Sequence, residues 1–140
     1  LSRLQEMPDF LPDRLEAGTH NVHGAVGLLE GLRFVRRLGP GRAARHEAAL
    51  LSALAGRLRR TGRYRVFDGG GTVLSVVPLD TSPEELADTL AQRGVAVRAG
   101  LHCAPLAHIT AGTVQTGTLR FSMSVFNTIE EVEQVAEMLS

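Results

Sequence analysis

The apolar residues of this 140-residue chain change their spacing near Gly62, from a helical period to a strand period. Before Gly62, two runs repeat apolar side chains every three to four residues, and a Gly-Pro-Gly sequence at 39–41 separates them. After Gly62, residues 63–67 and 73–77 are rich in valine or alternate between apolar and polar, as β-strands do. Helices and a sheet in one chain bury their apolar faces against each other. The pattern therefore predicts an α+β two-layer sandwich.

Capping and alternation signals predict the remaining elements. The first helical stripe begins at Ala25, and the Ser-Pro-Glu-Glu sequence at 82–85 is a capping box that predicts a helix to about Gln92. Two more strands and a last helix complete the order, at residues 95–98, at 118–124 and from the cap Thr128. A loop at 99–117 separates those two strands, and loops of this length inside compact domains are usually functional.

Charge, hydropathy and cysteine content exclude several classes of protein. Fifteen basic and fifteen acidic residues cancel, so the chain lacks the excess of cations that a dedicated nucleic-acid binder needs. No apolar run approaches the ~20 residues that cross a bilayer, and Arg3, Glu6 and Asp9 argue against a signal peptide. One cysteine excludes an internal disulfide. We therefore expect a cytoplasmic protein with no nucleic-acid or membrane partner.

Two absences concern the extent of the chain. All fifteen basic residues are arginine, so the chain contains no lysine. The sequence also begins at Leu1, within a short amphipathic stretch, rather than at a methionine. We expect this polypeptide to be a piece of something larger.

The loop at 99–117 carries the residues with the clearest chemistry. Cys103 has His102 beside it and Arg98 five residues earlier, and positive or imidazolium neighbours favour the nucleophilic thiolate. A lone cysteine is otherwise most often a small buried hydrophobe, and the residues alone leave both interpretations open. A metal site at His102, Cys103 and His108 is not favoured, because structural zinc needs four ligands and the chain offers no second pair.

Two arginines and a short segment before the first helix have two interpretations each. Arg120, on the polar face of the strand 118–124, is either solvent-exposed or a guanidinium held to grip a carboxylate in bidentate fashion. Arg98 has the same ambiguity. Gly18 and Thr19 either present a hydroxyl and backbone N–H groups to a phosphate or simply lead into the helix.

Three separated motifs resemble those of the class V, fold-type I pyridoxal-phosphate enzymes. They are the run RAGLHCAPLAH at 98–108, the run GTLRFS at 117–122 with FNT at 126–128, and EAGTHN at 16–21 with the helix that follows. The cysteine loop is most similar to that of the cysteine desulfurase and selenocysteine lyase branch. The resemblance covers essentially the whole chain but only roughly the last third of a family enzyme. It implies a small C-terminal α+β domain at 25–140, with residues 1–24 joining it to a large domain.

The resemblance implies a role for each matching residue. Cys103 matches the family nucleophile, which attacks the sulfur of a cysteine–pyridoxal adduct, becomes a persulfide and leaves alanine. Arg120 matches the arginine that binds the substrate carboxylate, while Arg98 and His102 match loop positions near the nucleophile. Thr19, preceded by Gly18, matches a threonine that reaches the cofactor phosphate of the neighbouring subunit in a homodimer.

The resemblance also implies partners and a cofactor. The substrate would be L-cysteine or L-selenocysteine, and a sulfur-acceptor protein would take the persulfide. Family enzymes hold pyridoxal 5'-phosphate as a Schiff base on a lysine, so we expect this chain neither to bind the cofactor covalently nor to be active alone. His20 departs from the proline that the family motif carries there. The alternatives are a class V aminotransferase or selenocysteine lyase relative, or a stand-alone, non-catalytic module for binding or for carrying sulfur.

Overall fold

The computed structural model describes residues 6–16 and 18–140, which divide into two compact units, Leu1–Gly39 and Pro40–Ser140. The first unit contains the 3₁₀ helix η1 (Asp13–Leu15) and the helix α1 (Val22–Leu38). Helix α1 begins before the predicted Ala25, because the side chain of Asn21 caps it by accepting a 2.9 Å hydrogen bond from the Gly24 N–H. No residue of α1 is buried. The predicted domain boundary at residue 24 remains a prediction.

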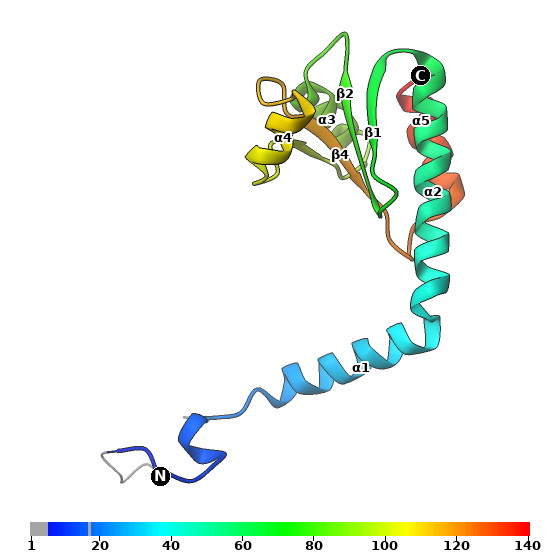
Figure 1. The fold of residues 1–140 in the computed structure, drawn as a ribbon. Helices are drawn as coiled ribbons and strands as arrows, with labels where there is room; N and C mark the ends of the chain where they lie inside the picture. The colour runs from blue at the N-terminus through cyan, green and yellow to red at the C-terminus, as the bar shows by residue number, and fades with distance from the viewer. Residues whose placement is uncertain (1–5, 17) are drawn as a thin grey trace. The chain divides into compact units, whose positions relative to one another are not determined.

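The second unit is a four-stranded antiparallel sheet with helices, as the α+β prediction required (Figure 1). The strands lie in the order β1-β2-β4-β3, and every neighbouring pair is antiparallel. The elements, in chain order, are α2 (Pro40–Thr61), β1 (Tyr64–Asp68), β2 (Val73–Pro78), α3 (Pro83–Gln92), β3 (Arg98–Gly100), α4 (Pro105–Ala111), β4 (Thr118–Ser122) and α5 (Ile129–Met138).

The apolar core lies between one face of the sheet and the helices α2, α3 and α5. Leu54 and Leu58 of α2 and Leu74 of β2 are completely buried, and so are Val76 and Leu119 from the central strands. The other core members come from the flanking helices and strand ends, namely Leu50, Leu51, Ala55, Tyr64, Leu90, Phe121, Val132, Ala136 and Leu139. Helix α4 contributes nothing to this core. It lies on the opposite side of the sheet from α2 (Figure 1).

Three predictions around the cysteine loop differ from the structure. The strand predicted at 95–98 is β3 at Arg98–Gly100, since the Val95 N–H still bonds to the Leu90 carbonyl at the end of α3. The loop predicted at 99–117 contains α4, a short helix that starts with proline and ends at Gly112 in the left-handed region. The strand predicted at 118–124 ends at Ser122.

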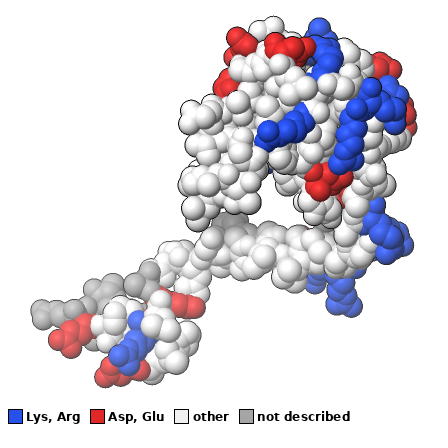
Figure 2. Space-filling model, turned by 45° about the horizontal axis from the view of Figure 1, so that its top comes forward, with Lys and Arg blue, Asp and Glu red and all other residues white. Residues whose placement is uncertain are grey.

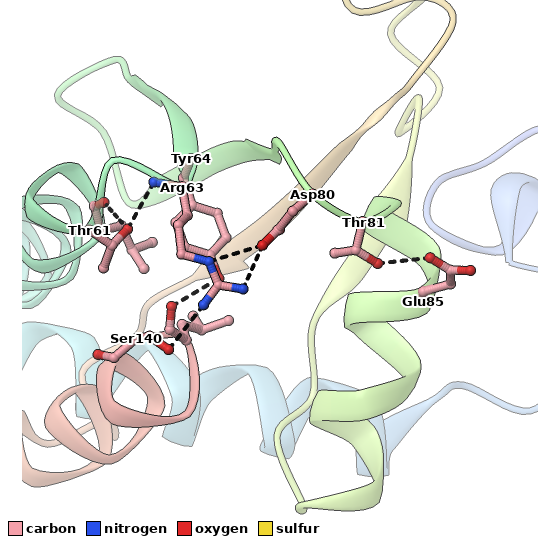
Figure 3. Close-up of polar contacts among 9 residues, drawn as sticks. Thr61, Arg63, Tyr64, Asp80, Thr81, Glu85 and Ser140 are labelled. Atoms are coloured by element: carbon pink, nitrogen blue, oxygen red, sulfur yellow. Dashed lines mark hydrogen bonds and ion pairs between the residues drawn. The ribbon is translucent and has the colours of Figure 1, made fainter.

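A polar cluster fastens β1 to the end of α5 (Figure 3). The Arg63 guanidinium donates to Asp80 Oδ2 at 2.6 and 3.0 Å and to the Ser140 carbonyl at 3.0 Å. The buried Tyr64 hydroxyl donates to the Leu139 carbonyl at 3.0 Å, and burial raises the pKa of this tyrosine. The bonds to Ser140 and Leu139 join residues that lie more than 70 positions apart in the chain, so they stabilise the packing of the C-terminal end of α5 against β1.

The surface charges are mixed in sign. Figure 2 shows basic and acidic side chains interspersed on the visible face, several of them next to each other, in keeping with a net charge of zero. None of the described helices is long and apolar enough to cross a membrane.

Candidate functional site

The sheet face opposite the core brings predicted site residues into one row. Phe67 of β1 pairs with Ser75 of β2, Ser75 pairs with Arg120 of β4, and Arg120 pairs with Arg98 of β3. Side chains alternate across a strand, so these four positions share one face while Leu119 and its inward neighbours enter the core. The alternation in 118–122 therefore places Arg120 on the face away from the core, as the sequence pattern predicted.

Arg120 is held on this face with part of its donor capacity unused. Its side chain is half-buried, and its Nε is buried with no hydrogen-bond partner among the described residues. Arg98, directly opposite, is exposed, and neither guanidinium forms an ion pair within residues 6–16 and 18–140. Like charges directly opposite each other in a sheet are destabilising, and a buried unpaired donor is costly. The arrangement therefore suits an anion lying against both side chains.

His102 lies beside these arginines and is held by β4. Its Nε2 is 3.2 Å from the Thr118 carbonyl oxygen and 3.1 Å from the Thr118 hydroxyl. Because a carbonyl can only accept, the contact places the proton on Nε2. Burial, followed by the positive charge of Arg120, lowers the pKa of His102, with smaller contributions from His108 and Arg98. The ring is therefore neutral near pH 7.

Cys103 is exposed, which excludes its interpretation as a buried hydrophobe. It follows His102 in a tight turn, and both residues adopt left-handed backbone angles, with φ of 52° and 57°. The turn is closed by the Ala104 N–H, which donates to the Leu101 carbonyl at 2.9 Å. Consecutive non-glycine residues in this region are strained, and such conformations cluster at functional sites.

Two glycines close the base of the cysteine loop. An added Cβ at Gly117, whose φ is +63°, would lie 2.9 Å from the Cα of Gly100 on the neighbouring strand. Such a contact is too short for any side chain, so glycine at 117 lets the two ends of the loop approach closely. The close approach of Gly100 and Gly117 therefore fixes the ends of the loop that contains the strained turn at 102–103.

Gly18 and Thr19 belong to the first compact unit. They line a hollow of about 650 Å³, together with Glu16, His20 and Asn21 and with apolar side chains at the start of α1. The 2.7 Å contact between His20 Nε2 and a Glu16 carboxylate oxygen crosses this segment. The role of Gly18 and Thr19 toward a phosphate remains a prediction.

Sequence reasoning missed the polar contacts beneath α4. His108 is buried, and its Nδ1 lies 2.7 Å from the hydroxyl of Thr113, which is also buried. The sequence gives no signal for this pair except two polar residues five positions apart. No group of three or more metal-ligating side chains gathers in the described part of the chain, so nothing here supports a metal at His102, Cys103 and His108.

Comparison with known proteins places this site in context. The family model for class-V aminotransferases matches residues 4–135. A probable cysteine desulfurase of Mycolicibacterium paratuberculosis is 41% identical over 125 residues, covering 87% of this chain and 18% of that protein. The cysteine desulfurase of Synechococcus elongatus is 39% identical over 133 residues, covering 89% of this chain and 20% of that protein.

Solved structures agree with the sequence relatives. The apo structure of a cysteine desulfurase from Thermococcus onnurineus NA1 superposes with a TM-score of 0.80 at 32% identity, covering 91% of this chain and 32% of that chain. A cysteine desulfurase from Escherichia coli gives a TM-score of 0.79 at 29% identity, covering 90% of this chain and 31% of that chain. The chain thus spans about a third or less of the length of the relatives it matches.

Proposed function

This chain belongs to the class-V aminotransferase family, and from that membership we propose that it is the cysteine-loop part of a cysteine desulfurase. The family depends on pyridoxal phosphate. In the proposed reaction the sulfur of L-cysteine passes to Cys103, and L-alanine is released. L-Selenocysteine would react in the same way and is the second substrate to test.

The cation cluster beside an exposed thiol is the observation that carries this proposal. Arg98 and Arg120 face each other without a described carboxylate partner, and the Arg120 Nε is a buried donor without an acceptor. The α-carboxylate of an amino acid would satisfy these donors, since guanidinium groups bind carboxylates in bidentate fashion. His102, whose neutral ring lies beside these arginines, directly precedes Cys103, so a substrate held by its carboxylate would lie near the thiol.

The proposed transfer balances in atoms and electrons. The Cys103 thiolate forms a new S–S bond with the substrate sulfur, and the substrate Cβ–S bond breaks. The electron pair of that bond goes to the carbon side, which takes up a proton and becomes alanine. Cys103 is left as a persulfide. The coenzyme, when bound, supplies the electron sink for the carbon centre.

The residues of this chain could supply only some of the contacts that bind the coenzyme. No side-chain amine is present, because the chain contains no lysine, so the covalent attachment must come from residues outside this sequence. A hydroxyl at Thr19 and the backbone at Gly18 are suited to a phosphate group next to the start of α1. We include in the proposal a homodimer, in which Thr19 serves the neighbouring subunit, and an acceptor protein for the persulfide sulfur.

A graft into a homologous enzyme tests the function. The matching segment of the Thermococcus onnurineus cysteine desulfurase would be replaced by this chain, and coenzyme loading checked by absorbance. We expect the loaded graft to form alanine from L-cysteine, with a persulfide detected on Cys103 by mass spectrometry. We expect the Cys103→Ser graft to bind coenzyme and form no persulfide.

Two results would refute the assignment. A coenzyme-loaded graft that forms no alanine from either substrate would leave a non-catalytic module as the better description. Alanine formation from L-cysteine that survives Cys103→Ser would show that this thiol is not the sulfur acceptor, and would favour a relative such as a selenocysteine lyase that has no need of it. The segment native to the Thermococcus onnurineus enzyme provides the matched control for the effect of grafting itself.

A further inference from the structure

His108 is a buried titratable residue that the proposed reaction does not use. It is the one buried residue of α4, with 7% of its surface exposed. Its Nδ1 contacts the Thr113 hydroxyl at 2.7 Å, and Thr113 itself is 1% exposed. The ring also lies against that of His102, with 5.9 Å between the ring centroids and 45° between the ring planes. His108 therefore connects the end of α4 to the residue that precedes Cys103.

Helix α4 lies outside the hydrophobic core and makes a polar contact with β1. No α4 residue belongs to the hydrophobic core. A cavity of about 160 Å³ lies between α4 and the sheet, lined by Phe67, Ser75 and Thr118 on the sheet side. At the C-terminal end of the helix the Arg65 guanidinium, 4.7 Å above the Phe67 ring, donates to the Ala111 carbonyl at 2.6 Å.

The turn that carries Cys103 needs such support. A left-handed conformation is unfavourable for a non-glycine residue, and two such residues follow one another here. Strain of this kind persists only where surrounding contacts fix the conformation. Thr118 holds the edge of the His102 ring through Nε2, and His108 packs against that same ring.

We propose that His108 is a positioning residue for Cys103: fixed by the Thr113 hydroxyl, its ring packs against His102 and keeps the left-handed turn in the conformation that presents the thiol. The proposal rests on the proposed function, because it is the reaction of Cys103 that gives this conformation its purpose. His108 touches neither the thiol nor the substrate in this account and acts only through His102.

Nuclear magnetic resonance on the 140-residue chain tests the proposal without substrate or coenzyme. Thr113→Val removes the hydroxyl with little change of shape, and Thr113→Ser keeps it. We expect Thr113→Val to speed hydrogen exchange of the Ala104 N–H at least tenfold and to shift the His102 titration to higher pH. The shift follows because His102 would be less buried and farther from His108, while Arg98 and Arg120 still face it. We expect Thr113→Ser to behave like the parent.

A second variant separates positioning from a general loss of stability. His108→Asn can keep a bond to Thr113 but removes the ring, so it should change Ala104 exchange and the His102 titration as Thr113→Val does. His46→Gln, on the exposed side of α2, is the control and should change neither.

Exchange of the Leu74 and Val76 amides in β2 reports the global fold. Parent-like Ala104 exchange and His102 titration in both Thr113→Val and His108→Asn would overturn the proposal. So would changes matched by an equal loss of protection at Leu74 and Val76. These outcomes are independent of the graft, so a graft that fails to form a persulfide refutes the function of Cys103 and not the bracing of its turn.

Discussion

Arg98 and Arg120 stand directly opposite each other on β3 and β4, and no described carboxylate lies between them. In a sheet built only for stability this pairing would be unfavourable, because like charges across a strand pair repel. An anion bound beside the exposed thiol would offset the repulsion between the two guanidinium groups.

Removing one of the two charges should stabilise the folded chain. For Arg98→Gln we expect the free energy of unfolding to rise by about 0.5 kcal/mol at low salt, in the range of cross-strand pair effects. The gain should shrink in roughly 0.5 M salt, since counterions screen exposed charges. Urea unfolding at two salt concentrations measures both effects. A variant that is less stable than the parent at low salt would contradict the repulsion.

Shortening the donor set at Arg120 should weaken substrate binding. In the active graft, Arg120→Lys loses the paired donors of the guanidinium, and a hydrogen bond to a charged group contributes about 1.5–3 kcal/mol. We expect KM for L-cysteine to rise at least tenfold, with a smaller change in kcat. Steady-state alanine formation measures this, and Arg57→Lys on the exposed side of α2 is the matched control. An unchanged KM would remove Arg120 from the carboxylate site.

The elements that the sequence predicted well depend on nearby residues. Both capping boxes form, at Ser82 with Glu85 and at Thr128 with Glu131, because each needs only side chains and N–H groups within one turn. Helix α4 escaped prediction because it buries a single residue, His108, and so shows no apolar stripe. Elements fixed by neighbouring residues could therefore be predicted from the sequence, whereas a short, exposed helix could not.

The site itself depends on register between distant strands. Alternation placed Arg120 on the polar face, but only the pairing of β3 with β4 sets Arg98 against it. The same register leaves the Arg120 Nε without a partner, which no local pattern can indicate. Exposure of Cys103 likewise follows from the turn at 102–103 and from the loop ends at Gly100 and Gly117.

Because the pKa of His102 is lowered, the free energy of unfolding should depend on pH just below neutrality. In the folded chain this ring is neutral at a pH where the unfolded chain, with an ordinary histidine pKa of about 6.5, already binds a proton. Stability therefore rises with pH through this window and falls as the pH drops below about 6.5. We expect His102→Gln to flatten this part of the curve.

Urea midpoints between about pH 5 and pH 7.5 would measure the slope for parent and variant. His46→Gln serves as the control, because it removes a histidine from the same unit without touching the arginine cluster. Equal slopes for the parent and His102→Gln would show that His102 titrates normally in the folded chain.

Asp80 should add stability that also rises with pH, as for His102, but in a more acidic range. The hydrogen bond from Arg63 lowers the pKa of the Asp80 carboxyl, so the folded chain keeps it ionised to lower pH than the unfolded chain does. Its contribution is present above an ordinary aspartate pKa of about 3.9 and is lost as the pH falls through the lower folded value. We expect Asp80→Asn to be less stable than the parent at pH 6, with the difference closing toward pH 2. Asp88→Asn, at an exposed position of α3, should match the parent at pH 6. A constant difference in stability between Asp80→Asn and the parent across this range would contradict the coupling.

The close approach of Gly117 and Gly100 makes the strongest stability prediction. An alanine Cβ at 117 would meet backbone atoms of Gly100 at 2.9–3.1 Å, and a backbone cannot move aside as a flexible side chain can. Together with the cost of φ +63° for a non-glycine residue, we expect Gly117→Ala to lose about 3 kcal/mol. Thermal unfolding should show Tm lowered by roughly 10 °C. Gly71→Ala, with no atom within 4 Å of the added Cβ, should leave Tm nearly unchanged. If Gly117→Ala were as stable as Gly71→Ala, the loop base would be wider than described, and the turn that presents Cys103 would lose its fixed starting point.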